Sequence, residues 1–182
     1  SLIKKFFLHS KDLNSEKSSF KKLKKKKSIL LIFSAIENYS ESSEIRYVGG
    51  CIRKILNNEN VDDIDFAVNL KPNECIEVLK KNNIKYYETG VDHGTLTVII
   101  ENDKFEITSL RKDLITDGRH AKVSFSRDWY VDASRRDFTI NSIYSDIDGN
   151  LYDPFNGKKD LKIGKIEFIG DIEKRIKEDY LR

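Results

Sequence analysis

The stretch Tyr47-Val48-Gly49-Gly50-Cys51-Ile52-Arg53, followed ten residues later by Asp63-Ile64-Asp65, decides how this chain of 182 residues is interpreted. After a short apolar strand predicted at 45–48, the glycine pair permits a turn with positive φ and lets a ligand approach the backbone closely. A helix predicted at 50–56 then directs its free N–H groups at an anion near the turn. The predicted phosphate-binding residues are Gly49, Gly50 and Arg53.

The acidic pair predicts a metal site. In an extended strand alternate side chains share a face, so Asp63 and Asp65 point the same way, about 7 Å apart, while Ile64 turns toward the core. Two such carboxylates suit Mg²⁺, which takes oxygen ligands and completes its shell with phosphate oxygens. Each pattern alone is more often an ordinary turn or a solvated strand edge, so the prediction rests on their combination.

The composition describes a globular protein, with 38% hydrophobic and 35% charged residues. No apolar run approaches the ~20 residues that span a bilayer, so we expect no membrane contact. Two cysteines do not make a disulfide framework, which favours a reducing, cytoplasmic location. No protein partner is evident. Because the chain begins with Ser1 and contains no Met, we expect it to be a piece of a longer protein.

Positive charge is concentrated in the N-terminal segment. Residues 1–27 carry ten lysines against two acids, a net charge of +8 in a chain whose total is +3. Lysine blocks are commonly solvated helix ends, but a phosphate-attracting role is the alternative here. We therefore predict a basic N-terminal extension at 1–43 that contains a helix at 18–39.

Apolar periodicity predicts alternating helices and strands in an α+β fold with a mixed, mainly antiparallel sheet. The stretch 111–133 has neither period, so we expect a long flexible loop around Asp117, Gly118 and Arg119. Beyond the elements already named, the predicted helices are 72–81, 134–143 and one from Asp171, and the predicted strands are 63–69, 84–88, 95–101, 104–110, 151–152 and 165–169.

Three further groups of residues are candidates for the site. Glu106 lies mid-strand, opposite to its apolar neighbours, and is a third metal ligand or an exposed acid. On a predicted helix, Asp137 and Asn141 share a face four residues apart, where they suit ribose hydroxyls. The adjacent Arg135 and Arg136 suit phosphates, unless this is only a basic helix start.

At the end of the chain, Asp179 and Arg182 stand three residues apart on a predicted helix, so that they form either a recognition pair or a surface ion pair. A carboxylate only accepts and a guanidinium only donates. Cytosine and adenine present an amine beside a ring acceptor and match such a pair, whereas guanine and uracil present the reverse.

The order of these motifs resembles class II tRNA nucleotidyltransferases, the CCA-adding enzymes, and their bacterial poly(A) polymerase relatives. The resemblance covers about residues 44–182 and includes a nucleotidyltransferase head at 44–160 and the start of a helical neck at 161–182, without the body and tail. The motifs that carry it are Gly49-Gly50-x-x-Arg53, Asp63-x-Asp65, Phe105-Glu106-Ile107-Thr108-Ser109-Leu110-Arg111, Asp117-Gly118-Arg119, Arg135-Arg136-Asp137-Phe138-Thr139-Ile140-Asn141, Asp153-Pro154-Phe155-x-Gly157-x-x-Asp160-Leu161 and Glu178-Asp179-x-x-Arg182.

The resemblance implies a CTP(ATP):tRNA nucleotidyltransferase that adds C, C and A to the tRNA 3′ end by two-metal phosphoryl transfer with Mg²⁺. It implies that Asp63 and Asp65 hold the metal ions, and that Asp179 and Arg182 read the base of CTP or ATP. By the same resemblance, Gly49, Gly50 and Arg53 cradle the triphosphate, and Arg135, Arg136, Asp137 and Asn141 contact ribose and phosphates. The alternatives are a poly(A) polymerase, a CC- or A-adding specialist, and a non-catalytic RNA-binding remnant.

The chain departs from the family pattern at two positions near the acidic pair. Lys54 stands where the family usually has Asp, and Asp62 adds a third acid directly before the pair. The register of the motif nevertheless makes Asp63 the expected metal ligand.

Overall fold

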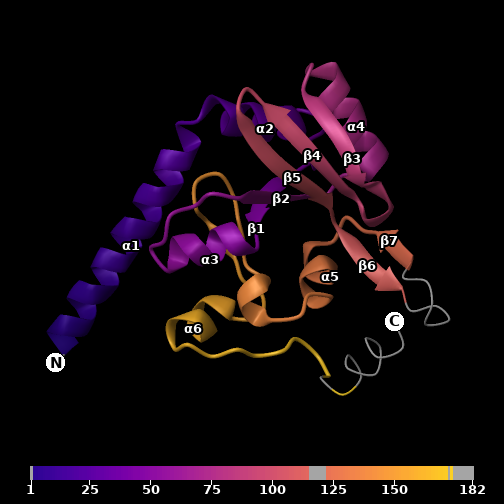
Figure 1. Ribbon diagram of the computed structural model, residues 1–182. Helices are drawn as coiled ribbons and strands as arrows, with labels where there is room; N and C mark the ends of the chain where they lie inside the picture. The colour runs from indigo at the N-terminus through magenta and orange to yellow at the C-terminus, as the bar shows by residue number, and fades with distance from the viewer. Residues whose placement is uncertain (1, 115–121, 172, 174–182) are drawn as a thin grey trace.

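The computed structural model describes residues 2–114, 122–171 and 173, with side chains from Leu13 onward (Figure 1). Its helices are α1 (Leu2–Lys24), α2 (Lys27–Glu37), α3 (Gly50–Leu56), α4 (Pro72–Lys81), α5 (Trp129–Ser134) and α6 (Gly157–Lys162), with short 3₁₀ turns η1 (Val91–His93) and η2 (Thr139–Asn141). Its strands are β1 (Ile45–Val48), β2 (Ile64–Val68), β3 (Lys85–Gly90), β4 (Thr95–Ile100), β5 (Asp103–Ser109), β6 (Arg111–Leu114), β7 (Lys122–Phe125), β8 (Tyr144–Ser145) and β9 (Leu151–Tyr152).

A mixed sheet forms the centre of the molecule. Within the described residues it has seven strands in the order β3-β4-β5-β2-β1-β8-β9, and β6 and β7 form a separate hairpin. Among these pairs β2 and β5 run parallel, and the other neighbours are antiparallel. The predicted α+β class with a mixed, mainly antiparallel sheet is confirmed.

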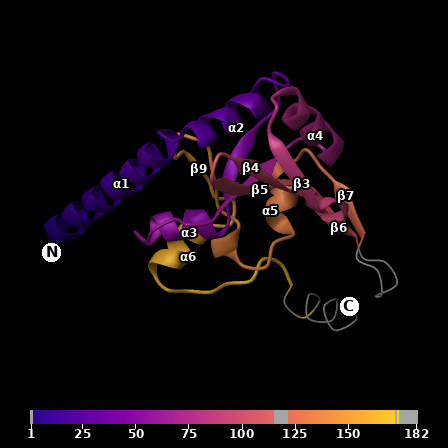
Figure 2. The same ribbon diagram turned by 45° about the horizontal axis from the view of Figure 1, so that its top comes forward.

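One face of the sheet carries the main core. Aromatic rings continue from α1 to β5, with centroid separations of 5.9 Å for Phe20 and Tyr47, 5.3 Å for Phe33 and Tyr47, and 5.7 Å for Phe66 and Phe105. Helices α2, α3 and α4 add buried aliphatic side chains to the same cluster. Figure 2 shows α1 and α2 following one another along this side of the sheet.

The opposite face carries a smaller core beneath α5, which contains Val48, Ala67, Ala133 and Tyr144. Because side chains alternate along β2, Phe66 enters the main core while Asp65 turns toward the α5 side. The strand pattern therefore places the acidic residues on a face that is only partly covered by apolar packing.

Four predicted elements differ from the structure. The helix expected at 18–39 is two helices that meet at Lys25 and Lys26, and the expected loop 111–133 holds β6, β7 and α5 in its described part. In place of the helix expected at 134–143, the structure has α5, which ends at Ser134. It begins at Trp129 because the Asp128 carboxylate caps its N-terminus by accepting the N–H groups of Tyr130 and Val131.

The strand expected at 165–169 is reduced to a single bridge between Phe138 and Phe168. The predicted loop residues Asp117, Gly118 and Arg119 and the predicted base-reading residues Asp179 and Arg182 lie outside the described residues. No helix in the described part of the chain combines the length and apolar character needed to cross a bilayer.

Candidate active site

The predicted metal ligands lie together at one end of the parallel pair β2 and β5. The register sets Asp65 beside Glu106, and Asp63 immediately precedes β2. All three line one hollow of about 530 Å³. The other lining residues are Lys26, Asp62, Ile64, Asn102, Asp103, Lys104 and Phe105. The predicted proximity of Glu106 to the acidic pair is thus present in the structure.

The electrostatics of the hollow favour a cation. Partial burial, followed by the negative charges of Glu106 and Asp63, raises the pKa of Asp65, and the positive charge of Arg136 opposes this. Among the described residues no group of three acidic, histidine or cysteine side chains converges closely enough to enclose a metal ion. Mg²⁺ does not need such a cage, because it is held by one or two carboxylates together with water and substrate phosphates. Asp63 and Asp65 therefore fit it.

The neighbouring acid Asp62 behaves differently. Its side chain is 72% exposed and pairs with Lys54 on α3. This ion pair joins the two positions at which the chain departs from the family pattern. It occupies the carboxylate of Asp62 and sets that residue apart from Asp63, Asp65 and Glu106, the other candidate acids of the hollow.

The glycine turn has the backbone that the sequence predicts. Gly49 adopts φ +76° and ψ −133°, a backbone conformation that residues with a side chain rarely adopt. Apart from the glycine itself and its two chain neighbours, no atom lies within 4 Å of the position that a Cβ would take. The turn is therefore open to an approaching ligand. One turn into α3, Arg53 donates from Nη1 to Oδ1 of Asn141 at 2.9 Å, across 88 residues of sequence.

Asp137 and Asn141 also meet, although not on a helix. Asn141 lies in the 3₁₀ turn η2, and its Nδ2 donates to Oδ1 of Asp137 at 3.1 Å. Together with Arg53 they form a continuous polar chain beside the glycine turn. The structure thus brings the predicted triphosphate-binding and ribose-binding residues into direct contact.

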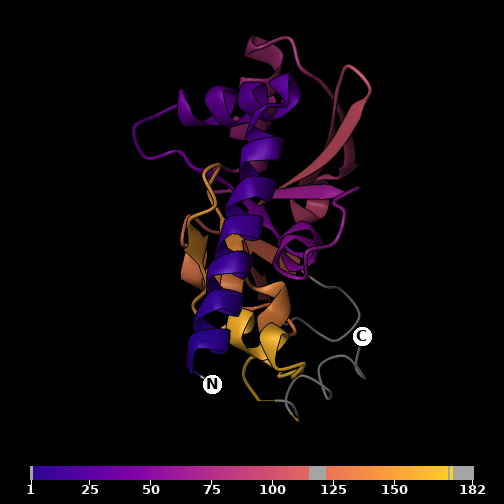
Figure 3. The ribbon, with the colours of Figure 1, turned by 90° about the vertical axis from the view of Figure 1, so that its left-hand side faces the viewer.

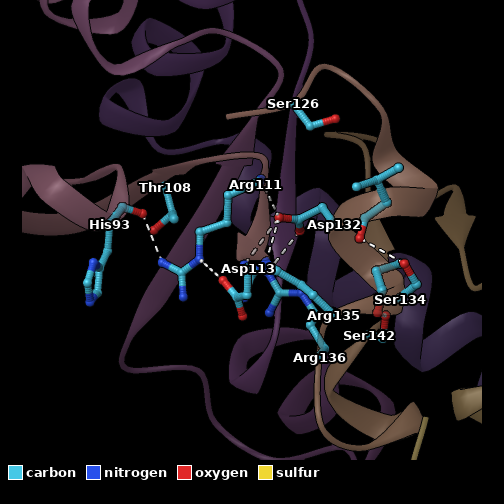
Figure 4. Close-up of polar contacts among 12 residues, drawn as sticks. His93, Thr108, Arg111, Asp113, Ser126, Asp132, Ser134, Arg135, Arg136 and Ser142 are labelled. Carbon is cyan, nitrogen blue, oxygen red and sulfur yellow. Dashed lines mark hydrogen bonds and ion pairs between the residues drawn. The ribbon is translucent and has the colours of Figure 1, made fainter. Parts of the chain in front are cut away.

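The two arginines are anchored by a residue that the sequence analysis missed. Asp132, which is 1% exposed, accepts from Arg135 Nε at 3.2 Å and from Arg136 Nη2 at 3.3 Å (Figure 4). The same carboxylate accepts from the Tyr144 hydroxyl at 2.6 Å and from the backbone N–H of Arg111 at 3.1 Å.

A sequence signal for Asp132 does exist. The acid stands three and four residues before Arg135 and Arg136, the spacing of ion pairs on a helix. The signal was lost because the helix was predicted to begin at Ser134. Since the true helix begins at Trp129, Asp132 lies within its buried part.

Comparison with known proteins agrees with this geometry. Residues 45–167 match the family described as the poly A polymerase head domain. The chain belongs to this family. Among curated members, it is 47% identical over 143 residues to human "CCA tRNA nucleotidyltransferase 1, mitochondrial", and 39% identical over 141 residues to the "CCA-adding enzyme" of Lactobacillus johnsonii. These alignments cover 78% and 76% of the chain.

A solved structure has the same head fold. The Bacillus stearothermophilus CCA-adding enzyme in complex with CTP superposes with a TM-score of 0.70 at 30% identity, over 82% of this chain and 35% of that one. The resemblance to CCA-adding enzymes stated from the motifs is confirmed. The chain spans about one third of the length of the curated relatives, which were aligned over 33% and 34% of their own sequences.

Proposed function

We propose that the protein to which this poly A polymerase head domain belongs is a CTP(ATP):tRNA nucleotidyltransferase that adds C, C and A to the tRNA 3′ end without a nucleic-acid template. The observation that supports it most is the convergence of three motifs far apart in the sequence. The acids of β2 and β5 line one hollow, Arg53 contacts Asn141, and the charge of Arg136 acts on Asp65.

Each residue then has a role in transfer. The open turn at Gly49 and Gly50 admits the triphosphate, and Arg53 neutralises its charge. Asp137 and Asn141 offer an acceptor and an amide to the ribose hydroxyls. Arg135 and Arg136, held by Asp132, present further positive charge to the phosphates. The tRNA 3′-hydroxyl gives up its proton and its oxygen attacks the α-phosphorus of the nucleotide. A phosphodiester bond forms, the bond from the α-phosphorus to the α,β-bridging oxygen breaks, and pyrophosphate leaves.

Asp63 and Asp65, with Glu106 beside them, would hold Mg²⁺. Bound there, the metal would supply positive charge that stabilises the transferring phosphoryl group and favours ionisation of the 3′-hydroxyl. Our assignment of Mg²⁺ is supported by the donor set, which consists of carboxylate oxygens at the edge of an open hollow.

The names of the relatives favour CCA addition over poly(A) synthesis. The test is to incubate the full-length protein with tRNA that lacks its 3′ end and with each nucleotide separately and in combination. A CCA-adding enzyme adds two C residues with CTP alone and stops after one A when ATP is present. Unlimited A addition would identify a poly(A) polymerase, addition of only C or only A would identify a specialist, and no addition would favour a binding remnant.

A first prediction concerns base selection by Asp179 and Arg182, whose roles rest on the family resemblance and on their donor and acceptor chemistry. Arg182→Ala should weaken CTP and ATP binding, because each missing charged hydrogen bond costs about 1.5–3 kcal/mol, or about ten- to a hundredfold. Asp179→Ala should relax the rejection of UTP and GTP, because the repelling acceptor is removed. Binding of all four nucleotides to the full-length protein measures both effects. If both variants kept the selectivity of the parent, Asp179 and Arg182 would form only a surface ion pair and would not read the base.

Two predictions on the wider protein remain. We propose that the segment with Asp117, Gly118 and Arg119 governs the change from adding C to adding A. We also propose a cytoplasmic location, although the human relative is named as a mitochondrial protein. Imaging of the tagged full-length protein in its source cells tests the location.

A further inference from the structure

The junction between α1 and α2 carries a group of exposed cations. We call Lys21, Lys22, Lys25, Lys26 and Lys27 the junction lysines, and all five are exposed. Within the described part of the chain no ion pair joins any of them to an acid, whereas their neighbour Lys24 pairs with Asp148 at 2.6 Å. This surface therefore keeps its full positive charge for a partner.

The junction lysines begin at the candidate active site. Lys26 lines the same hollow as Asp63, Asp65 and Glu106. The first turn of α2 is tied to another wall of that hollow, because Ser28 Oγ donates to Asp103 Oδ2 at 2.7 Å. The remaining junction lysines lie on either side of Lys26 in the chain, along the start of α2 and the end of α1.

The C-terminal half of α1 packs against the rest of the domain and is not a free tail. Phe20 is 2% exposed in the main core. Glu16 pairs with Lys158 of α6 at 2.9 Å, and Figure 3 shows α1 running along the molecule past α6. The cations of the junction consequently have a set position relative to the hollow. The family match begins at residue 45, so it assigns no role to them.

The chemistry of the hollow indicates which ligand these cations take. The clustered acids repel any phosphate that approaches, and Lys26 and Lys104, both on the wall of the hollow, offset that repulsion. A nucleoside triphosphate is compact, and Arg53 and the glycine turn already provide a proposed binding site for it. A row of exposed lysines matches instead the repeated phosphates of a nucleic-acid strand, which lysines neutralise without reading its sequence.

We propose that the junction lysines bind the backbone phosphates of the RNA strand whose 3′ end reacts in the hollow, and so guide that strand into the site. The identity of the strand as a reacting substrate rests on the proposed function. The binding of RNA phosphates at this surface does not.

The test uses the full-length protein with Lys25→Ala and Lys26→Ala combined. The matched control combines Lys80→Ala and Lys81→Ala on α4, which removes the same charge from lysines that do not line the hollow. Fluorescence anisotropy with labelled tRNA lacking its 3′ end gives the dissociation constant at several salt concentrations. We expect weaker binding for the junction variant alone, and a salt slope smaller by roughly 0.7–0.9 for each phosphate that the variant no longer neutralises.

A second variant, Lys21→Ala with Lys22→Ala, extends the test along α1. In nucleotide addition, both junction variants should raise the KM for tRNA several-fold. Lys21→Ala with Lys22→Ala, which does not touch the lining of the hollow, should leave the KM for CTP unchanged. RNA affinity and salt slope equal to those of the control variant would overturn the proposal, even if CCA addition is observed. Conversely, the protein could fail to add nucleotides while only the junction variants lose RNA affinity. That result would overturn the proposed function and support RNA binding by the junction lysines.

Discussion

Replacing Asp65 with Asn in the full-length protein is expected to abolish nucleotide addition while leaving the fold intact. Asp65 lies beside Glu106 and near Asp63, so the change removes the charge of one proposed metal ligand from the hollow and spares the core. Metal ions supply several kcal/mol of transition-state stabilisation in such reactions, so we expect a loss of about a thousandfold or more. The rate of single-turnover CTP addition to tRNA, with Mg²⁺ in excess, measures this loss. We expect the same loss for Asp63→Asn.

The neighbouring Asp62 offers a matched control for this prediction. Asp62→Asn removes the same charge from the same hollow, but this carboxylate pairs with Lys54 and is 72% exposed. We expect near-normal turnover from it. Near-normal turnover by Asp65→Asn, or equal losses in all three variants, would mean that general negative charge matters and that the metal assignment is wrong.

The largest expected effect on stability comes from Asp132→Ala. This side chain is 1% exposed and pairs with Arg135 and Arg136, which are 15% and 18% exposed. Removing one partner of a buried ion pair leaves uncompensated charge and costs about 3–5 kcal/mol. Urea denaturation should show that decrease in the free energy of unfolding, and the affinity for CTP should fall because the arginines lose their anchor.

The same carboxylate predicts an acid limit to stability. Burial raises the pKa of Asp132, but its ion pairs with Arg136 and Arg135 and the Tyr144 hydrogen bond outweigh burial and hold the pKa below its ordinary value. Because the pKa is lower in the folded state, the carboxylate contributes its full stability at pH values above the unfolded-state pKa of about 3.9. That contribution is lost as the pH falls below this value and through the folded-state pKa. The variant should therefore differ least from the parent at strongly acidic pH.

Asp113→Ala is the control for both measurements. Its carboxylate also pairs with an arginine, Arg111, at 3.2 Å, but it is 31% exposed. Partly exposed pairs contribute about 1 kcal/mol or less. If Asp132→Ala cost no more than Asp113→Ala, the buried network would not be the anchor of the two arginines.

Local patterns in the sequence were enough to predict the elements that carry the acids and the glycine turn. Alternation along 63–66 separated the site face from the core, and Gly49 has the backbone that its residue type favours. The contact of Arg53 with Asn141 was beyond such reasoning, because it depends on how segments 88 residues apart pack together. The helix containing Asp132 was placed too late because the cap at Asp128 was not recognised.

The continuous row of aromatic rings bears on how this domain can be moved between proteins. Phe33 on α2 lies 5.5 Å from Phe66, and Phe20 on α1 packs on Tyr47, yet both helices precede the first residue of the family match. A fragment that begins at residue 45 would lack Phe20 and Phe33, and the rings of Tyr47 and Phe66 against which they pack would be exposed to water. The unit that evolution or an engineer can transplant therefore includes α2 and the end of α1, and a boundary drawn from family similarity alone falls inside it.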